Sequence, residues 1–116
     1  MNGSIYLKVK IKSLAAEARI IRLEEMRAHK RGNHALCEGL YQHRRGVVRT
    51  EARATQIAYA YLRGHAYAKV EPHTSKPIDW TKVKSMIERY GGNKFDSDAF
   101  NMWVKGTQVP IPAVAG

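Results

Sequence analysis

The sequence has one cysteine and no long apolar run, and each absence excludes a class of protein. Because Cys37 has no second cysteine to pair with, an internal disulfide framework is excluded, and an intracellular protein is the simplest interpretation. A membrane-spanning helix needs roughly 18 consecutive apolar residues, and no stretch approaches that length. The first ten residues also lack the basic-then-apolar order of a secretory signal. We therefore expect a cytoplasmic protein without a membrane partner.

Residue patterns that carry catalysis or hold metals are also scarce. The five histidines include no pair four residues apart, and the spacing Cys-x-x-Cys does not occur. There is no glycine-rich phosphate loop and no nucleophile elbow. Cys37 lies near Leu36 and Leu40, so we interpret it as a small core residue rather than a nucleophile. The sequence thus predicts no enzyme, no catalytic residue, no cofactor and no metal site.

Acidic residues are few relative to basic ones. The chain has 20 Lys and Arg against 10 Asp and Glu, which gives a net charge of +10 at pH 7. Residues 1–63 hold 13 of the basic and only 5 of the acidic residues, and they include nine of the ten arginines. A charge of this size opposes compaction and attracts anionic partners. The asymmetry places the expected partner on the first half of the chain.

The N-terminal residues show the alternation of a strand. With 116 residues, of which 44% are hydrophobic, one domain is expected over residues 1–116. Ile5, Leu7, Val9 and Ile11 alternate with polar residues or tyrosine, and a period of two predicts a β-strand. A strand needs a partner, which could be the extended tail over residues 107–116 or another subunit. The predicted fold is therefore mainly α, a small helical bundle with a short N-terminal β-strand.

Helical periodicity dominates the rest of the chain. The expected helices cover residues 13–31, 34–63, 65–71 and 80–90, followed by a short one from about residue 96. Ser13 and Asp79 are suitable caps for two of them. In the first helix, Leu14 and Ile21 share one face while Ile20 lies opposite. A helix that is apolar on two sides is usually covered on both. We expect its second face to contact the strand or another subunit.

The second long helix carries a row of arginines. Its predicted apolar stripe comprises Leu36, Leu40, His43, Val47, Ala54, Ile57, Ala58 and Tyr61, and either Gly39 or Gly46 is a candidate bend. Arg45, Arg49 and Arg53 repeat every four residues on the opposite side. Like charges at this spacing destabilise a helix by about 0.2–0.5 kcal/mol per pair. Arginine grips phosphate with two parallel hydrogen bonds, so the row predicts a surface for phosphate groups.

Further polar residues extend this predicted surface. The additional nucleic-acid-binding candidates are Arg44, Lys8, Lys10, Lys12, Arg27, Lys30 and Arg31. The last three of these lie near a helix end, where cations also stabilise the negative pole of the helix dipole. His43 and Glu51 form a candidate polar cluster. Glu51 could orient Arg44 or His43 towards a ligand, although fixing the helix register through buried hydrogen bonds is the favoured interpretation.

A helix-turn-helix is a weaker interpretation of residues 60–76. Ala60, Gly64 and Val70 have the small–glycine–aliphatic spacing of that motif. Pro72 would lie within the recognition helix, however, where proline costs about 3 kcal/mol. The alternative is a packed helical corner. Trp80 and Trp103 have apolar neighbours at helical spacing, so we interpret them as core residues rather than stacking platforms for bases.

Taken together, these patterns predict a non-enzymatic protein that binds DNA or RNA through phosphates. Such contacts position a nucleic acid without reading its sequence. The competing hypothesis is a small interaction or inhibitor subunit, of the kind that phages encode, that docks on an acidic protein surface or acts within a ribonucleoprotein complex. Helix 13–31, with its second apolar face, favours a protein partner or a homo-oligomer in either case.

Overall fold

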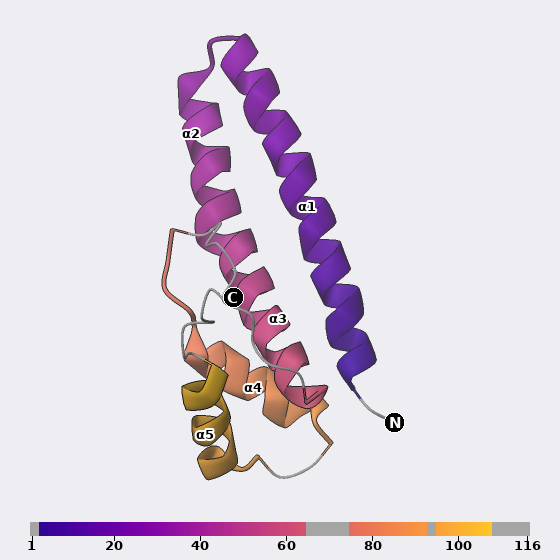
Figure 1. The fold of residues 1–116 in the computed structure, drawn as a ribbon. Helices are drawn as coiled ribbons and strands as arrows, with labels where there is room; N and C mark the ends of the chain where they lie inside the picture. The colour runs from indigo at the N-terminus through magenta and orange to yellow at the C-terminus, as the bar shows by residue number, and fades with distance from the viewer. Residues whose placement is uncertain (1–2, 65–74, 93–94, 108–116) are drawn as a thin grey trace, which may run out of the picture.

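The computed structural model describes residues 3–64, 75–92 and 95–107, and the regular elements in these ranges are all helical. In chain order they are α1 (Ser4–Lys30), α2 (His34–His43), the π-helical turn η1 (Arg44–Val48), α3 (Arg49–Leu62), α4 (Trp80–Tyr90) and α5 (Ser97–Thr107). Helix α1 lies along the continuous rod formed by α2, η1 and α3, and α4 and α5 lie at the end of this hairpin where α1 begins (Figure 1). None of the described helices has the length and apolar character required to cross a bilayer.

The predicted N-terminal strand is wrong, because α1 begins at Ser4 and includes residues 5–11. Leu7 is fully buried, whereas Ile5 and Val9 are 58% and 62% exposed. One face of α1 follows the alternating spacing of three and four residues that marks a packed helical seam. That buried or half-buried seam consists of Ser4, Leu7, Ile11, Leu14, Ala18, Ile21, Glu25 and Ala28. The proposed partner of the strand, the tail, lies outside the described residues from residue 108 onwards.

The second long helix is confirmed, but its register changes at η1. Hydrogen bonding in a π-helical turn spans five residues, so one extra residue is accommodated and the buried face shifts along the chain. Val48 is therefore buried, while Val47 is 48% exposed. His43, also predicted on the apolar stripe, is exposed for the same reason, and Leu36 is exposed near the tip. Beyond η1 the prediction holds, since Ala54, Ile57 and Ala58 are fully buried, and Tyr61 packs against them.

The main core lies where the end of α3 meets α4, α5 and the start of α1. Leu7, Ile57, Val83 and Phe100 are buried together there, and the rings of Tyr61 and Phe100 are 5.3 Å apart in an edge-to-face arrangement. Aromatic and aliphatic side chains from all four helices thus close this end of the hairpin. The elongated part of the hairpin has a second, thinner core of mostly small or aliphatic residues.

Helices α4 and α5 match the sequence prediction. The side chain of Asp79 accepts a hydrogen bond from the backbone N–H of Lys82 at 3.1 Å, and Asp96 caps α5 through the N–H of Ala99 at the same distance. Trp80 and Trp103 pack against the main core, as expected. The predicted helix 65–71, and with it the second half of the helix-turn-helix, falls mostly within residues 65–74, which lie outside the described ranges.

Two alanine substitutions test whether residues 5–11 form a helix or a strand. We expect Leu7→Ala to lower the free energy of unfolding by about 2–5 kcal/mol, because it leaves a cavity in the main core. Val9→Ala should change it by less than about 0.5 kcal/mol, because Val9 points outward from α1. On a strand both residues would share one face and give similar losses. Urea denaturation followed by circular dichroism measures both values.

Candidate nucleic-acid interface

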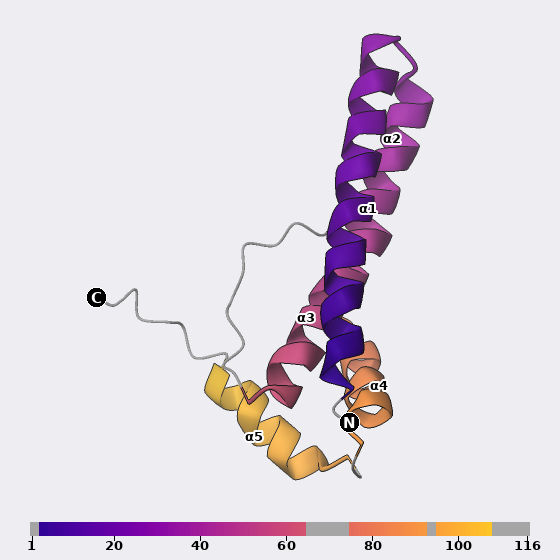
Figure 2. The ribbon, with the colours of Figure 1, turned by 90° about the vertical axis from the view of Figure 1, so that its right-hand side faces the viewer.

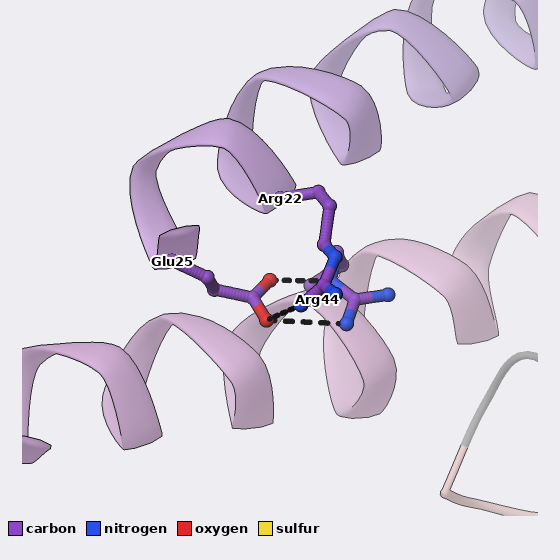
Figure 3. A network of polar contacts seen from close by, with 3 residues as sticks. All are labelled: Arg22, Glu25 and Arg44. Carbon is purple, nitrogen blue, oxygen red and sulfur yellow. Dashed lines mark hydrogen bonds and ion pairs between the residues drawn. The ribbon is translucent and has the colours of Figure 1, made fainter. Parts of the chain in front are cut away.

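A buried carboxylate organises the middle of the hairpin. Glu25 occupies the seam of α1, at a position where its neighbours are apolar, and only 1% of it is exposed. Arg44 enters the same interface from η1 and donates hydrogen bonds to both carboxylate oxygens, from Nε to Oε2 and from Nη2 to Oε1. Arg22, one turn before Glu25, donates from Nη1 to Oε1 at 3.3 Å (Figure 3). One carboxylate thus holds two guanidinium groups.

The geometry of this pair has electrostatic consequences. The hydrogen bonds that Arg44 donates to Glu25, reinforced by the negative charge of the carboxylate, raise the pKa of Arg44 above its usual range. Only 12% of the Arg44 side chain and 2% of the Glu25 side chain are exposed, so solvent screens the pair poorly. The Arg22 side chain is 59% exposed, and its guanidinium reaches the carboxylate from the solvent side. Glu25 therefore fixes Arg44 rigidly and Arg22 more loosely.

Beside this network, α1 and the opposite rod enclose an arginine-rich hollow, here called the arginine groove. Its volume is about 350 Å³. Its lining residues are Ala18, Arg19, Arg22, Leu23, Arg44 and Arg49. Four guanidinium groups and the one neighbouring carboxylate, Glu25, leave a local charge of +3. The groove therefore combines apolar walls with concentrated positive charge, a combination that strengthens attraction for anions.

Arg49, which lines the arginine groove, has one hydrogen-bond donor without a partner among the described residues. Its Nε is buried and has no hydrogen-bond partner among the residues that the structure describes. A buried donor without a partner costs about 1–3 kcal/mol, and more for a charged group. No described carboxylate forms an ion pair with Arg49 or with Arg45. The charge of Arg49 in the arginine groove is therefore not neutralised by a described carboxylate.

The structure places the predicted arginine row partly on this groove. Arg49 lines it, whereas Arg45 stacks over the ring of Tyr41, with 5.5 Å between guanidinium carbon and ring centroid. Arg45, Arg49 and Arg53 are each half-buried instead of fully outward-facing. The row also crosses from η1 into α3, so the π-helical turn interrupts its regular α-helical spacing. Arg44, predicted as an auxiliary, lines the groove and faces α1, one helical turn after the half-buried Leu40.

The remaining predicted residues lie in three other places. Lys10 does not share a face with Lys8 and Lys12 once residues 5–11 are helical, and its Nζ is 2.9 Å from Glu51. Glu51 pairs with Lys10 and, at 3.7 Å, with Lys82, so the predicted cluster of Glu51 with His43 or Arg44 does not form. The exposed set Arg27, Lys30 and Arg31 surrounds the C-terminal end of α1, where Lys30 also lines a second hollow of about 410 Å³.

Sequence reasoning missed three residues of the site, namely Arg19, Arg22 and Glu25. The first two precede the predicted cluster and appear on α1 as ordinary surface charges. Of these three, only Glu25 could have been recognised from the sequence. It continues the three-and-four spacing of small and aliphatic residues on the buried side of α1, and a carboxylate buried there needs a cationic partner. That partner had to come from the facing rod, and the structure shows that it is Arg44.

The ion pair of Glu51 predicts a small dependence of stability on pH. A hydrogen bond from Lys10, with the charges of Lys10 and Lys82, lowers the pKa of Glu51 from the ordinary 4.5. A folded-state pKa below the unfolded value contributes stability above pH 4.5 that is lost as the pH falls through the folded value. In urea titrations between pH 7 and about pH 3, Glu51→Gln should therefore lose less stability on acidification than the wild type. Equal acid sensitivity of the two proteins would contradict the assignment.

Comparison with protein families, with curated proteins and with solved structures gives no match to this chain.

Proposed function

We propose that this protein binds nucleic acid through its phosphate groups, with the arginine groove as the anchoring site. The observation that supports this function is the convergence of Arg19, Arg22, Arg44 and Arg49 on one hollow beside a single carboxylate. Guanidinium groups gathered this closely repel one another, and phosphate oxygens relieve the repulsion while matching the planar donor geometry. Arg49, which lines the groove and pairs with no described carboxylate, supports the same ligand chemistry.

The distribution of charge beyond the groove favours a polymer over a single small anion. The exposed residues Arg27, Lys30 and Arg31 continue the basic character from the groove towards the tip of the hairpin. A nucleic acid presents phosphates at regular intervals, so one strand could contact the groove and the tip together. Contacts of this kind carry no base information, and we expect weak sequence preference.

A salt titration with several nucleic acids tests the proposal. Labelled single-stranded DNA, duplex DNA and a structured RNA would be titrated with the full chain, and binding followed by fluorescence anisotropy. If about four phosphates are neutralised, the affinity should fall roughly 10²-fold between 50 and 200 mM salt. Binding of all three probes with a steep logarithmic slope is the expected result. Absence of binding to every probe at low salt would overturn the proposal and leave docking on an acidic protein as the surviving hypothesis.

A further inference from the structure

The outward face of α1 is unusually apolar for a helix side that the other described residues leave exposed, apart from a contact between Tyr6 and Tyr90 of α4, whose rings are 6.3 Å apart. Six of the nine exposed large hydrophobic side chains in the described ranges belong to α1, and they are Ile5, Tyr6, Val9, Ile20, Leu23 and Met26. Figure 2 shows α1 in front of the other described helices, with its outer side uncovered along its length. Exposed apolar area concentrated on one element marks an interaction surface.

The side chains on this face follow a heptad spacing. Tyr6, Val9, Ser13, Ala16, Ile20 and Leu23 are separated by alternating steps of three and four residues. This second seam lies on the side of α1 opposite the buried seam that contains Leu7 and Leu14. Its centre holds the small residues Ser13 and Ala16, and its ends hold large ones, so a second helix could approach closely. Heptad spacing of this kind is the pattern of a two-helix coiled coil.

The charges beside the seam indicate what covers it. Lys12 and Arg19 flank one side, and Glu17 and Glu24 flank the other, all of them exposed. Each basic residue precedes an acidic one by five positions, which is the offset of facing flank residues in a parallel coiled coil. In a parallel, in-register pair of α1 helices, Lys12 and Arg19 of one copy would face Glu17 and Glu24 of the second copy. In an antiparallel pair, residues on the same flank would face each other, which would place like charges together.

We propose that this face of α1 binds the α1 of a second copy of the chain, in parallel and in register. The complementary flanks select a second copy because each helix supplies both the basic and the acidic side. Arg19 and Leu23 also lie on the rim of the arginine groove, so the interface borders the proposed phosphate site. Arg22, Arg44 and Arg49 stay directed into the groove.

The effect of salt distinguishes dimerisation through α1 from the proposed binding of nucleic acid. Each copy carries a net charge of +10, so two copies repel over long distances, and added salt screens that repulsion. Phosphate binding weakens in the same conditions because counterions compete with the protein. Dimers that persist or strengthen at high salt, where nucleic acid dissociates, therefore form without bound nucleic acid.

Sedimentation equilibrium of the full chain at high salt tests the association. The wild type should show a mass that rises with concentration towards twice the monomer value, and Ile20→Glu/Leu23→Glu should sediment as a monomer. Both replaced side chains are more than half exposed, so helix content should be retained. Leu36→Glu/Met102→Glu makes the same chemical change at two exposed positions away from the seam, and should dimerise like the wild type. A wild type that stays monomeric, or a seam variant that still dimerises, would overturn the proposal.

Cross-linking tests the direction of the helices. In a Cys37→Ser background, I20C should form a disulfide-linked dimer in a glutathione redox buffer, because equivalent positions meet in a parallel pair. An antiparallel pair would separate these positions and bring Ile20 of one copy near Val9 of the other. Equal mixtures of I20C and V9C should therefore give mostly like-with-like dimers. Mostly mixed dimers would overturn the parallel arrangement.

Discussion

Replacing Glu25 with alanine should destabilise the protein by about 3–5 kcal/mol, which is the range for removing one partner of a buried ion pair. The reason is that Arg44 has only 12% of its side chain exposed and depends on Glu25 for two of its hydrogen bonds. Without the carboxylate, a charged group remains poorly solvated between α1 and η1. Urea denaturation at pH 7, with circular dichroism at the helix band, measures the loss as a lower midpoint at an unchanged slope.

Two matched variants test whether the unpaired buried charge of Arg44 causes the loss of stability expected for Glu25→Ala. Arg22→Ala removes the more exposed partner of the same carboxylate and should cost no more than about 1 kcal/mol. Glu25→Leu/Arg44→Met replaces both buried partners with apolar side chains of similar size and should recover most of the stability that Glu25→Ala loses. If the double variant is as unstable as Glu25→Ala, shape and packing at this position matter more than the charge.

The error at the N-terminus has a simple physical origin. Leu7 and Ile11 satisfy both the period of a strand and the spacing of a helix, so seven residues could not decide between them. The decision comes from the longer pattern, because steps of three and four continue from Leu7 through Ala28 without a break. Tertiary packing along α2 and α3 then stabilises α1 as one helix of 27 residues. The helices of residues 34–62, 80–90 and 97–107 were predictable because no second period competed there.

The site was only partly predictable because its geometry depends on η1. A regular helix would have buried Val47, as the sequence stripe implied, and would have placed Arg44 beside that stripe. The extra residue of the π-helical turn buries Val48 instead, one turn after Arg44, which pairs with Glu25 on α1. Gly46, a candidate bend in the sequence, lies inside this turn and is buried. Glycine weakens a helix at that point, but sequence periodicity alone does not distinguish a bend from an inserted residue.

The proposed function and the buried network are linked through the same guanidinium groups. Glu25 neutralises much of the charge of Arg44. Arg49 pairs with no described carboxylate, and the side chain of Arg22 is 59% exposed. Arg44 therefore contributes mainly to stability, whereas Arg49 and the more exposed Arg22 are better placed to bind phosphate. For this reason, variants of Arg44 would confuse loss of folding with loss of binding, and variants of Arg22 and Arg49 are the informative ones.

Arg22→Glu/Arg49→Glu should weaken nucleic-acid binding by roughly 10²-fold or more at low salt, since charged hydrogen bonds contribute about 1.5–3 kcal/mol each. The slope of logarithmic affinity against logarithmic salt should fall by about 2, one unit for each phosphate contact removed. Anisotropy titrations with the same probes at several salt concentrations give both quantities. Circular dichroism of the free variant confirms that the hairpin is still folded.

The control for this variant has the same net charge but leaves the arginine groove intact. Arg63→Glu/Arg89→Glu changes two exposed arginines elsewhere, one at the end of α3 and one in α4, and lowers the net charge equally. If binding depended only on overall charge, the two double variants would lose affinity to the same extent, and the arginine groove would have no special role. Of the four substituted arginines, only Arg22 and Arg49 line the arginine groove. We therefore expect the control to keep most of its affinity and nearly all of its salt slope.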